Sequence, residues 1–144
     1  MNTSPTDDGR FADKFPAYSG VMVRYRDTVL LCKRRPDVDA KYLPGYWSVP
    51  AGYVEPEEDI KTCAVRETEE ETGISIPAGE TKFLAAYPSS DGEGVFYDYL
   101  YRSPTKFEPI LDQEHTEWGY FGIDEIPTPI TDEMKNDVIL ALSD

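Results

Sequence analysis

The chain has 144 residues, 40% hydrophobic and 12% aromatic, so its length and composition predict one globular domain rather than a disordered acidic chain. Its 14 basic and 28 acidic residues give a formal charge of −14, which argues against nucleic acid polymers and anionic membranes as partners. Two cysteines and one histidine exclude a disulfide framework and a multi-histidine metal site, and the lack of a long apolar run predicts a cytoplasmic protein.

The N-terminal part of the chain is predicted to be rich in β-structure. Residues 1–17 are expected to form a tail or an added edge segment, so that the domain proper spans 18–144. Two β-rich runs at 19–25 and 29–33 flank a short polar turn and predict a hairpin. After an irregular stretch that contains prolines, a short strand is expected at 47–49.

The middle of the chain combines a helix with a second hairpin. Residues 59–72 contain good helix formers and neither Gly nor Pro, and Gly73 stands where a C-terminal cap belongs. Strands are expected at 81–87 and 95–102, because the Asp-Gly pair at 91–92 between them is a strong hairpin signal.

The C-terminal part is predicted to add one strand and one helix. The strand is expected at 118–122, and the helix at 131–142 with Thr131 as its N-cap. Hairpins combined with two helices indicate an α+β fold, with the helices packed on a mainly antiparallel sheet.

The helix at 59–72 has an unusual face. Ile60 and Cys63 form an apolar stripe on a helical wheel, and Glu67, Glu70 and Glu71 continue the same stripe. Carboxylates at these spacings repel one another, and a hard divalent cation such as Mg²⁺ would compensate that repulsion. The alternative is a solvated acidic face, since glutamate is among the best helix formers.

Residues 52–74 carry a specific family resemblance. The segment resembles the Nudix box of the Nudix hydrolase superfamily, GX5EX7REUXEEXGU, in which U is a bulky apolar residue. The matching positions are Gly52, Glu58, Arg66, Glu67, Glu70, Glu71, Gly73 and Ile74. One position departs, because Thr68 stands where the pattern has its first U, so looser packing is expected there. The resemblance implies an α/β/α sandwich around a mixed sheet, in which the box forms a loop, a helix and a loop and a C-terminal helix follows.

The same resemblance implies an activity and a set of site residues. Nudix enzymes use Mg²⁺ or Mn²⁺ to hydrolyse a diphosphate bond in a nucleoside diphosphate linked to another moiety, by attack of water at phosphorus. The implied metal ligands, which also count as catalytic, are Glu67, Glu70 and Glu71, with the backbone carbonyl of Gly52 as a further ligand. Arg66 and Glu58 are expected to hold these glutamates in place.

The resemblance leaves two places for the general base, because Nudix enzymes use a glutamate either on the box helix or in a distant loop, and residues 114–127 resemble that later loop. Glu114 is the preferred candidate, ahead of Asp112 and Glu117. The neighbouring His115 either contacts substrate or has no part in the site.

Basic residues are scarce, so their clustering is informative. Lys33, Arg34 and Arg35 follow one another at the end of the second predicted strand and are candidates for binding a phosphate group. The alternative is a solvated strand end.

The substrate is less constrained than the reaction. Pro88 follows Gly73 by fifteen residues, which resembles a feature of ADP-ribose and ADP-sugar pyrophosphatases, although a proline is also common where a strand ends. This class is favoured, while dinucleoside polyphosphates and (d)NTPs stay open as substrates. A nucleotide-binding module without hydrolysis is a further alternative, but the complete set of box glutamates favours an enzyme. The expected partner is therefore a nucleotide-derived small molecule, and assembly as a homodimer stays open.

Overall fold

The computed structural model describes residues 16–143 and contains seven strands and two α-helices, with two short 3-10 helices. In chain order these are β1 (Ala17–Tyr25), β2 (Thr28–Arg34), a 3-10 turn (Ala40–Tyr42), β3 (Trp47–Ser48), β4 (Ala51–Tyr53), α1 (Ile60–Thr72), a second 3-10 turn (Ala78–Glu80), β5 (Thr81–Pro88), β6 (Val95–Arg102), β7 (His115–Phe121) and α2 (Asp132–Ala141). The expected tail at 1–17 lies outside the described residues, except for its last two positions. None of the described helices is long and apolar enough to cross a membrane.

The strands form one mixed sheet between the two helices. Its order is β3-β2-β1-β6-β5, with β4 paired to β1 and β7 paired to β2. The β1–β6 pair is parallel and the other pairs are antiparallel. The mainly antiparallel sheet expected from the hairpin signals is confirmed, and so is the mixed sheet implied by the Nudix resemblance. The hairpin signals did not predict the parallel pair, because they report only neighbours in the sequence.

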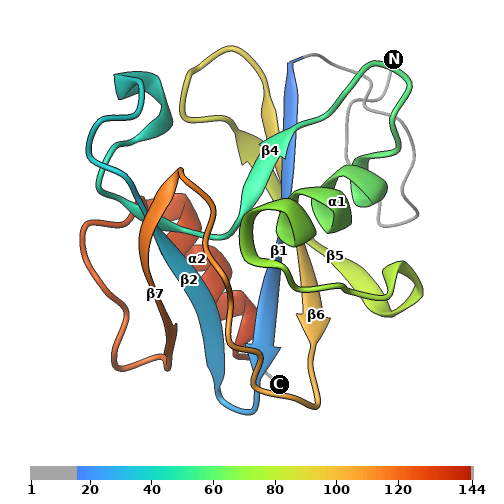
Figure 1. Ribbon diagram of the computed structural model, residues 1–144, viewed down its shortest axis with the longest axis vertical. Coiled ribbons are helices and arrows are strands. Elements are labelled where there is room, and N and C mark those ends of the chain that lie inside the picture. The colour runs from blue at the N-terminus through green and yellow to red at the C-terminus, as the bar shows by residue number, and fades with distance from the viewer. Residues whose placement is uncertain (1–15, 144) are drawn as a thin grey trace.

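Alternation along β1 divides the core into two layers. Val21 and Val23 pack with α1 on one face of the sheet, and Met22 packs with α2 on the other. Successive side chains of a strand point to opposite faces, so the continuous apolar run at 21–23 must be covered on both sides of the sheet. Figure 1 shows the result, with α1 in front of the sheet and α2 behind it.

The expected elements are confirmed with small shifts. Helix α1 ends at Gly73, whose φ of 75° is left-handed and whose N–H donates to Glu69 O at 2.8 Å. Thr131 caps α2, since its side chain accepts a hydrogen bond from the Met134 N–H at 3.1 Å. The strand expected at 118–122 instead begins at His115, because its pairing with β2 extends to Arg34.

The departure from the box pattern at Thr68 leaves no polar group without a hydrogen bond. The Thr68 side chain is fully buried, and its Oγ1 donates to the carbonyl oxygen of Ala64 at 2.9 Å, one turn earlier in α1. A buried hydroxyl that bonds the preceding turn of its own helix is satisfied without any partner from the core.

Two buried carboxyl groups lie where α2 meets the sheet. Asp98 of β6 is 0% exposed and Asp137 of α2 is 3% exposed. Burial and then hydrogen bonding to Asp137 raise the pKa of Asp98 well above its usual range, and burial raises the pKa of Asp137. The pair therefore needs a proton between the two carboxyl groups.

Replacing Asp98 with Asn is expected to stabilise the fold at alkaline pH. A carboxyl group whose pKa is higher in the folded than in the unfolded chain binds more protons when folded, so the free energy of unfolding falls as pH rises above about 4. The Asn amide is a permanent donor to Asp137, so D98N should gain about 1–3 kcal/mol at pH 8 and little at pH 4. Urea unfolding at both pH values measures this, with D124N at an exposed position as the control. A gain that does not grow with pH would contradict it.

Candidate functional site

Arg66 organises the acidic face of α1. Its guanidinium bonds both oxygens of Glu58, at 2.8 and 3.0 Å, and its Nη1 donates to Glu67 at 2.9 Å and to Glu70 at 3.0 Å. Hydrogen bonding to Glu58 is the main cause that raises the pKa of Arg66, and the same bond lowers the pKa of Glu58. One cation thus fixes three carboxylates, which offsets the repulsion expected between Glu67 and Glu70.

Gly52 brings the backbone of β4 against the Glu67 carboxylate. Pairing of Gly52 with Ser19 of β1 fixes this part of β4 beside α1. A Cβ added at Gly52 would lie 2.1 Å from Glu67 Cδ, a distance that no side chain can occupy. The close approach therefore requires glycine at position 52.

Glu71 is the buried member of the glutamate set. It is 4% exposed, and its Oε1 accepts a hydrogen bond from the Ala51 N–H at 3.3 Å. Burial, followed by the neighbouring Glu67, raises the pKa of Glu71 to about 10. A carboxylate in this position is poorly compensated by the protein alone, so the site favours the arrival of positive charge.

The loop before β7 is attached to the C-terminal end of α1. The Asp112 N–H donates to Glu71 O at 3.1 Å, and the Ile110 N–H donates to Thr72 O at 2.9 Å. Asp112 Oδ1 then accepts from the Glu114 N–H at 3.0 Å and lies 2.9 Å from His115 Nδ1. These bonds fix Glu114 beside the glutamates of α1, and burial lowers the pKa of His115.

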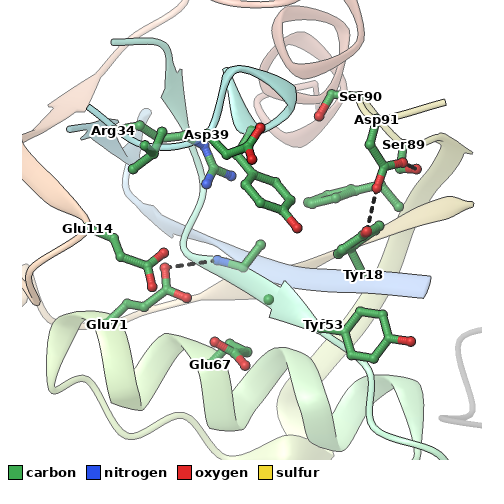
Figure 2. Close-up of a pocket in the computed structure, with 15 residues that line it drawn as sticks. Tyr18, Arg34, Asp39, Tyr53, Glu67, Glu71, Ser89, Ser90, Asp91 and Glu114 are labelled. Atoms are coloured by element: carbon green, nitrogen blue, oxygen red, sulfur yellow. Dashed lines mark hydrogen bonds between the residues drawn. The ribbon is translucent and has the colours of Figure 1, made fainter. Parts of the chain in front are cut away.

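A cavity of about 460 Å³ opens over these groups, a volume within the range of small-molecule sites. Its lining residues are Tyr18, Arg34, Val38, Asp39, Tyr42, Ala51, Gly52, Tyr53, Glu67, Glu71, Ser89, Ser90, Asp91, Phe96 and Glu114. Figure 2 shows Arg34, Glu71 and Glu114 at one end, with Tyr18 and Asp91 at the other. The two ends differ in kind, because the first gathers charges of both signs and the second combines aromatic and hydroxyl groups with the Asp91 carboxylate.

The side chains of Lys33, Arg34 and Arg35 have different surroundings in the structure. Arg34 lines the cavity, where burial lowers its pKa and the carboxylates of Glu71 and Glu114 oppose that effect. Lys33 instead pairs with Glu117 at 3.5 Å, and Arg35 donates to Gln113 O at 2.5 Å. Alternation along β2 separates Arg34 from its neighbours, so one of the three basic candidates is among the cavity residues.

The structure brings together much of the set expected from the sequence. Gly52, Glu67, Glu71 and Glu114 line the cavity together with Arg34. Glu70, whose side chain is 56% exposed, bonds Arg66 and is not among the lining residues. The cavity wall opposite Arg34 was only partly predicted from the sequence: Tyr18 is one of the aromatic residues that the sequence offers for stacking on a base, and Pro88 precedes the wall's serines, but Asp91 was not singled out as a site residue. In that wall Tyr18 Oη donates to Asp91, which Ser89 also bonds at 2.6 Å.

The donor set fits a divalent cation. Glu67 and Glu71 present carboxylates, the Gly52 backbone lies against Glu67, and Glu71, Asp112 and His115 offer ligand atoms that all lie within 4.8 Å of one another. His115 Nε2 is buried and has no hydrogen-bond partner among the described residues. Oxygen donors with an unfilled nitrogen beside them match the ligands that divalent ions take in proteins.

Comparisons with known proteins agree on one family. The model of the NUDIX domain matches residues 14–142. The chain is 36% identical over 129 residues to an RNA pyrophosphohydrolase of Erythrobacter litoralis, covering 76% of this chain and 77% of that protein. It is 38% identical over 112 residues to the NAD-capped RNA hydrolase NudC of Pseudomonas aeruginosa, covering 74% of this chain but 36% of that protein. Among solved structures, a MutT NUDIX hydrolase from Burkholderia pseudomallei superposes with a TM-score of 0.73 at 25% identity, covering 87% of this chain and 96% of that one.

Proposed function

The chain belongs to the NUDIX domain family and is a Nudix pyrophosphohydrolase, and from this premise we propose that it hydrolyses nucleoside diphosphates linked to a moiety without further phosphate, the ADP-ribose and ADP-sugar class. The observation that carries the proposal is the charge of the cavity wall. Among the described residues that line the cavity, Arg34 is the single cation, whereas Asp39, Glu67, Glu71, Asp91 and Glu114 are acidic.

The two ends of the cavity suit the two parts of such a substrate. At the Arg34 end, the guanidinium and a divalent ion held by the glutamates would receive the diphosphate. At the other end, Tyr18, Tyr53 and Phe96 offer ring surfaces and Ser90 a hydroxyl, which suit a base and a sugar. A further phosphate at that end would lie near Asp91, without a cation from the lining residues beside it (Figure 2).

Each residue of the site has a role in this proposal. Glu67, Glu71 and the Gly52 carbonyl hold the cation, and Glu70 joins them by leaving Arg66. The bound cation supplies charge that offsets the phosphate oxygens and lowers the pKa of a coordinated water. Glu114 accepts the proton of the water that attacks phosphorus, and Arg34 orients the diphosphate for that attack.

A matched pair of substrates tests the charge argument. NADH and NADPH contain the same diphosphate and differ by one phosphate on a ribose. We expect kcat/KM with Mg²⁺ or Mn²⁺ to be at least about tenfold higher for NADH, because the extra phosphate meets carboxylates rather than cations. Chromatography of the reduced nicotinamide mononucleotide that both substrates release on diphosphate hydrolysis measures both rates.

A panel that includes ADP-ribose, a dinucleoside tetraphosphate and RNA with a 5′-triphosphate or an NAD cap tests the substrate class. ADP-ribose should yield AMP and ribose 5-phosphate at the highest kcat/KM. Binding of ADP-ribose without product would instead indicate the non-hydrolytic module.

RNA 5′ ends are a second candidate, because two of the relatives are named as enzymes that act on RNA. The formal charge of −14 and the acidic cavity wall count against a long polyanion. Faster hydrolysis of the RNA ends than of ADP-ribose would favour this candidate over the first.

A further inference from the structure

His115 has a ring nitrogen whose partner is missing from the protein. The residue begins β7, and its side chain is 1% exposed. Asp112 Oδ1 lies 2.9 Å from His115 Nδ1, and an ionised carboxylate can only accept a hydrogen bond, so Nδ1 carries the hydrogen. The other nitrogen, Nε2, then carries no hydrogen and has an available lone pair. This atom is buried and has no hydrogen-bond partner among the described residues.

The free nitrogen faces the buried carboxylate of α1. His115 Nε2 lies 3.7 Å from Glu71 Oε1, which is too far for a hydrogen bond. Two ligands bound about 2.0–2.2 Å from one ion, at an angle between about 90° and 120°, are themselves about 2.8–3.8 Å apart. The separation therefore fits a cation that joins the two atoms.

Asp112 completes an arrangement typical of metal-binding histidines. Such a histidine usually donates its second ring N–H to a carboxylate, which fixes the ring and strengthens the metal-binding nitrogen. Asp112 has this position, and it is itself fixed by the Glu114 N–H at 3.0 Å. Arg34 interacts with the three carboxyl groups of Glu71, Asp112 and Glu114. One positive charge therefore faces three acidic groups in this part of the site.

We propose that His115 Nε2 and Glu71 Oε1 bind one divalent cation together, which makes the metal site of the proposed function a mixed nitrogen and oxygen site that favours Mn²⁺ or Zn²⁺ over Mg²⁺. The proposal rests on the proposed function only in sharing Glu71. Imidazole nitrogen suits transition metals, whereas Mg²⁺ takes oxygen ligands and keeps several waters.

The competing explanation is that His115 only anchors the loop through Asp112. His115→Asn separates the two roles, because the Asn amide can still donate to Asp112 from the place of Nδ1 while the atom at Nε2 is lost. A purely structural histidine predicts unchanged Mn²⁺ affinity in H115N.

Pulsed EPR of Mn²⁺ bound to the untagged protein tests the proposal. The chain has one histidine, so a ¹⁴N imidazole coupling to Mn²⁺ has one source. We expect this coupling in the unmodified protein and its loss in H115N, with Mn²⁺ binding weakened about tenfold or more. Circular dichroism of both proteins shows whether the variant is folded, and the coupling in the unmodified protein decides the matter even if it is not.

Hydrolysis of ADP-ribose in the same samples separates the two proposals. Mn²⁺ that binds without ¹⁴N coupling, or that does not bind, overturns the role of His115. Coupling without hydrolysis supports His115 as a ligand and counts against the proposed substrate. Hydrolysis without coupling leaves the proposed function intact and overturns the inference.

Discussion

Replacing Glu71 with Gln is expected to lower kcat/KM by more than about 100-fold, because even residues that only orient metal ligands cost about 10–100-fold when changed. The amide keeps the size and position of the side chain, and it can still accept from the Ala51 N–H. What it loses is the charge that binds a cation. Steady-state hydrolysis of the best substrate measures the effect, with E69Q on an exposed position of the same helix as the control.

The E71Q variant is expected to be more stable than the unmodified protein at alkaline pH, although it is less active. Burial raises the pKa of Glu71 to about 10, above the value near 4.3 in an unfolded chain. The folded protein therefore binds the extra proton between these values, and its free energy of unfolding falls as pH rises through that window. Without metal, E71Q should be more stable than the unmodified protein at pH 8, with a smaller difference at pH 5. A variant that loses both activity and stability at pH 8 would point to a structural role instead.

Replacing Gly52 with Ala is expected to lower kcat/KM by about 100-fold with little loss of stability. The new Cβ would lie 2.1 Å from Glu67 Cδ, so the carboxylate must move away. Since that atom is the end of a flexible side chain, the fold can adjust, but a metal ligand displaced by an ångström or more no longer holds its ion. Mn²⁺ binding and urea unfolding separate the two effects.

Gly79→Ala is the matched control for this change, because a Cβ there would meet nothing within 4 Å. G79A should leave metal binding and turnover unchanged. An active G52A enzyme with normal Mn²⁺ affinity would show that the Glu67 carboxylate is not needed where the structure has it.

Local features of the site could be predicted from the sequence, and its long-range features could not. The spacing of Glu67, Glu70 and Glu71 and the glycine cap at Gly73 are properties of one helix, so sequence separation alone expresses them. The register of β2 in the sheet determines which of its basic residues reaches the cavity, and the candidates are Lys33, Arg34 and Arg35. The β2–β7 register also shifts between Lys33 and Arg34, so simple alternation along the sequence does not predict which side chain faces the cavity.

Two further features had no local signal. Strand β4 is only three residues long and follows Pro50, so it was not predicted, although it fixes Gly52 beside Glu67. Asp98 and Asp137 look like ordinary surface acids within their segments, and only the packing of α2 on β6 and its neighbours makes them a buried pair. Tertiary contacts of this kind override local composition.

The parallel β1–β6 pair has a consequence for how the molecule folds. It joins positions 78 residues apart, from Ala17 with Val95 to Arg24 with Arg102, whereas the β1–β2 hairpin closes over two residues. Pairings of high sequence separation form slowly, because the entropy of closing a long loop is lost before their contacts form. The helix with its glutamates is a local structure, but the strand that supports β4 and Gly52 joins its parallel partner only after residue 102 has been synthesised. A nascent chain that ends before β6 therefore contains all the box residues and the β1–β4 pair, but lacks the parallel strand that lies on the other side of β1.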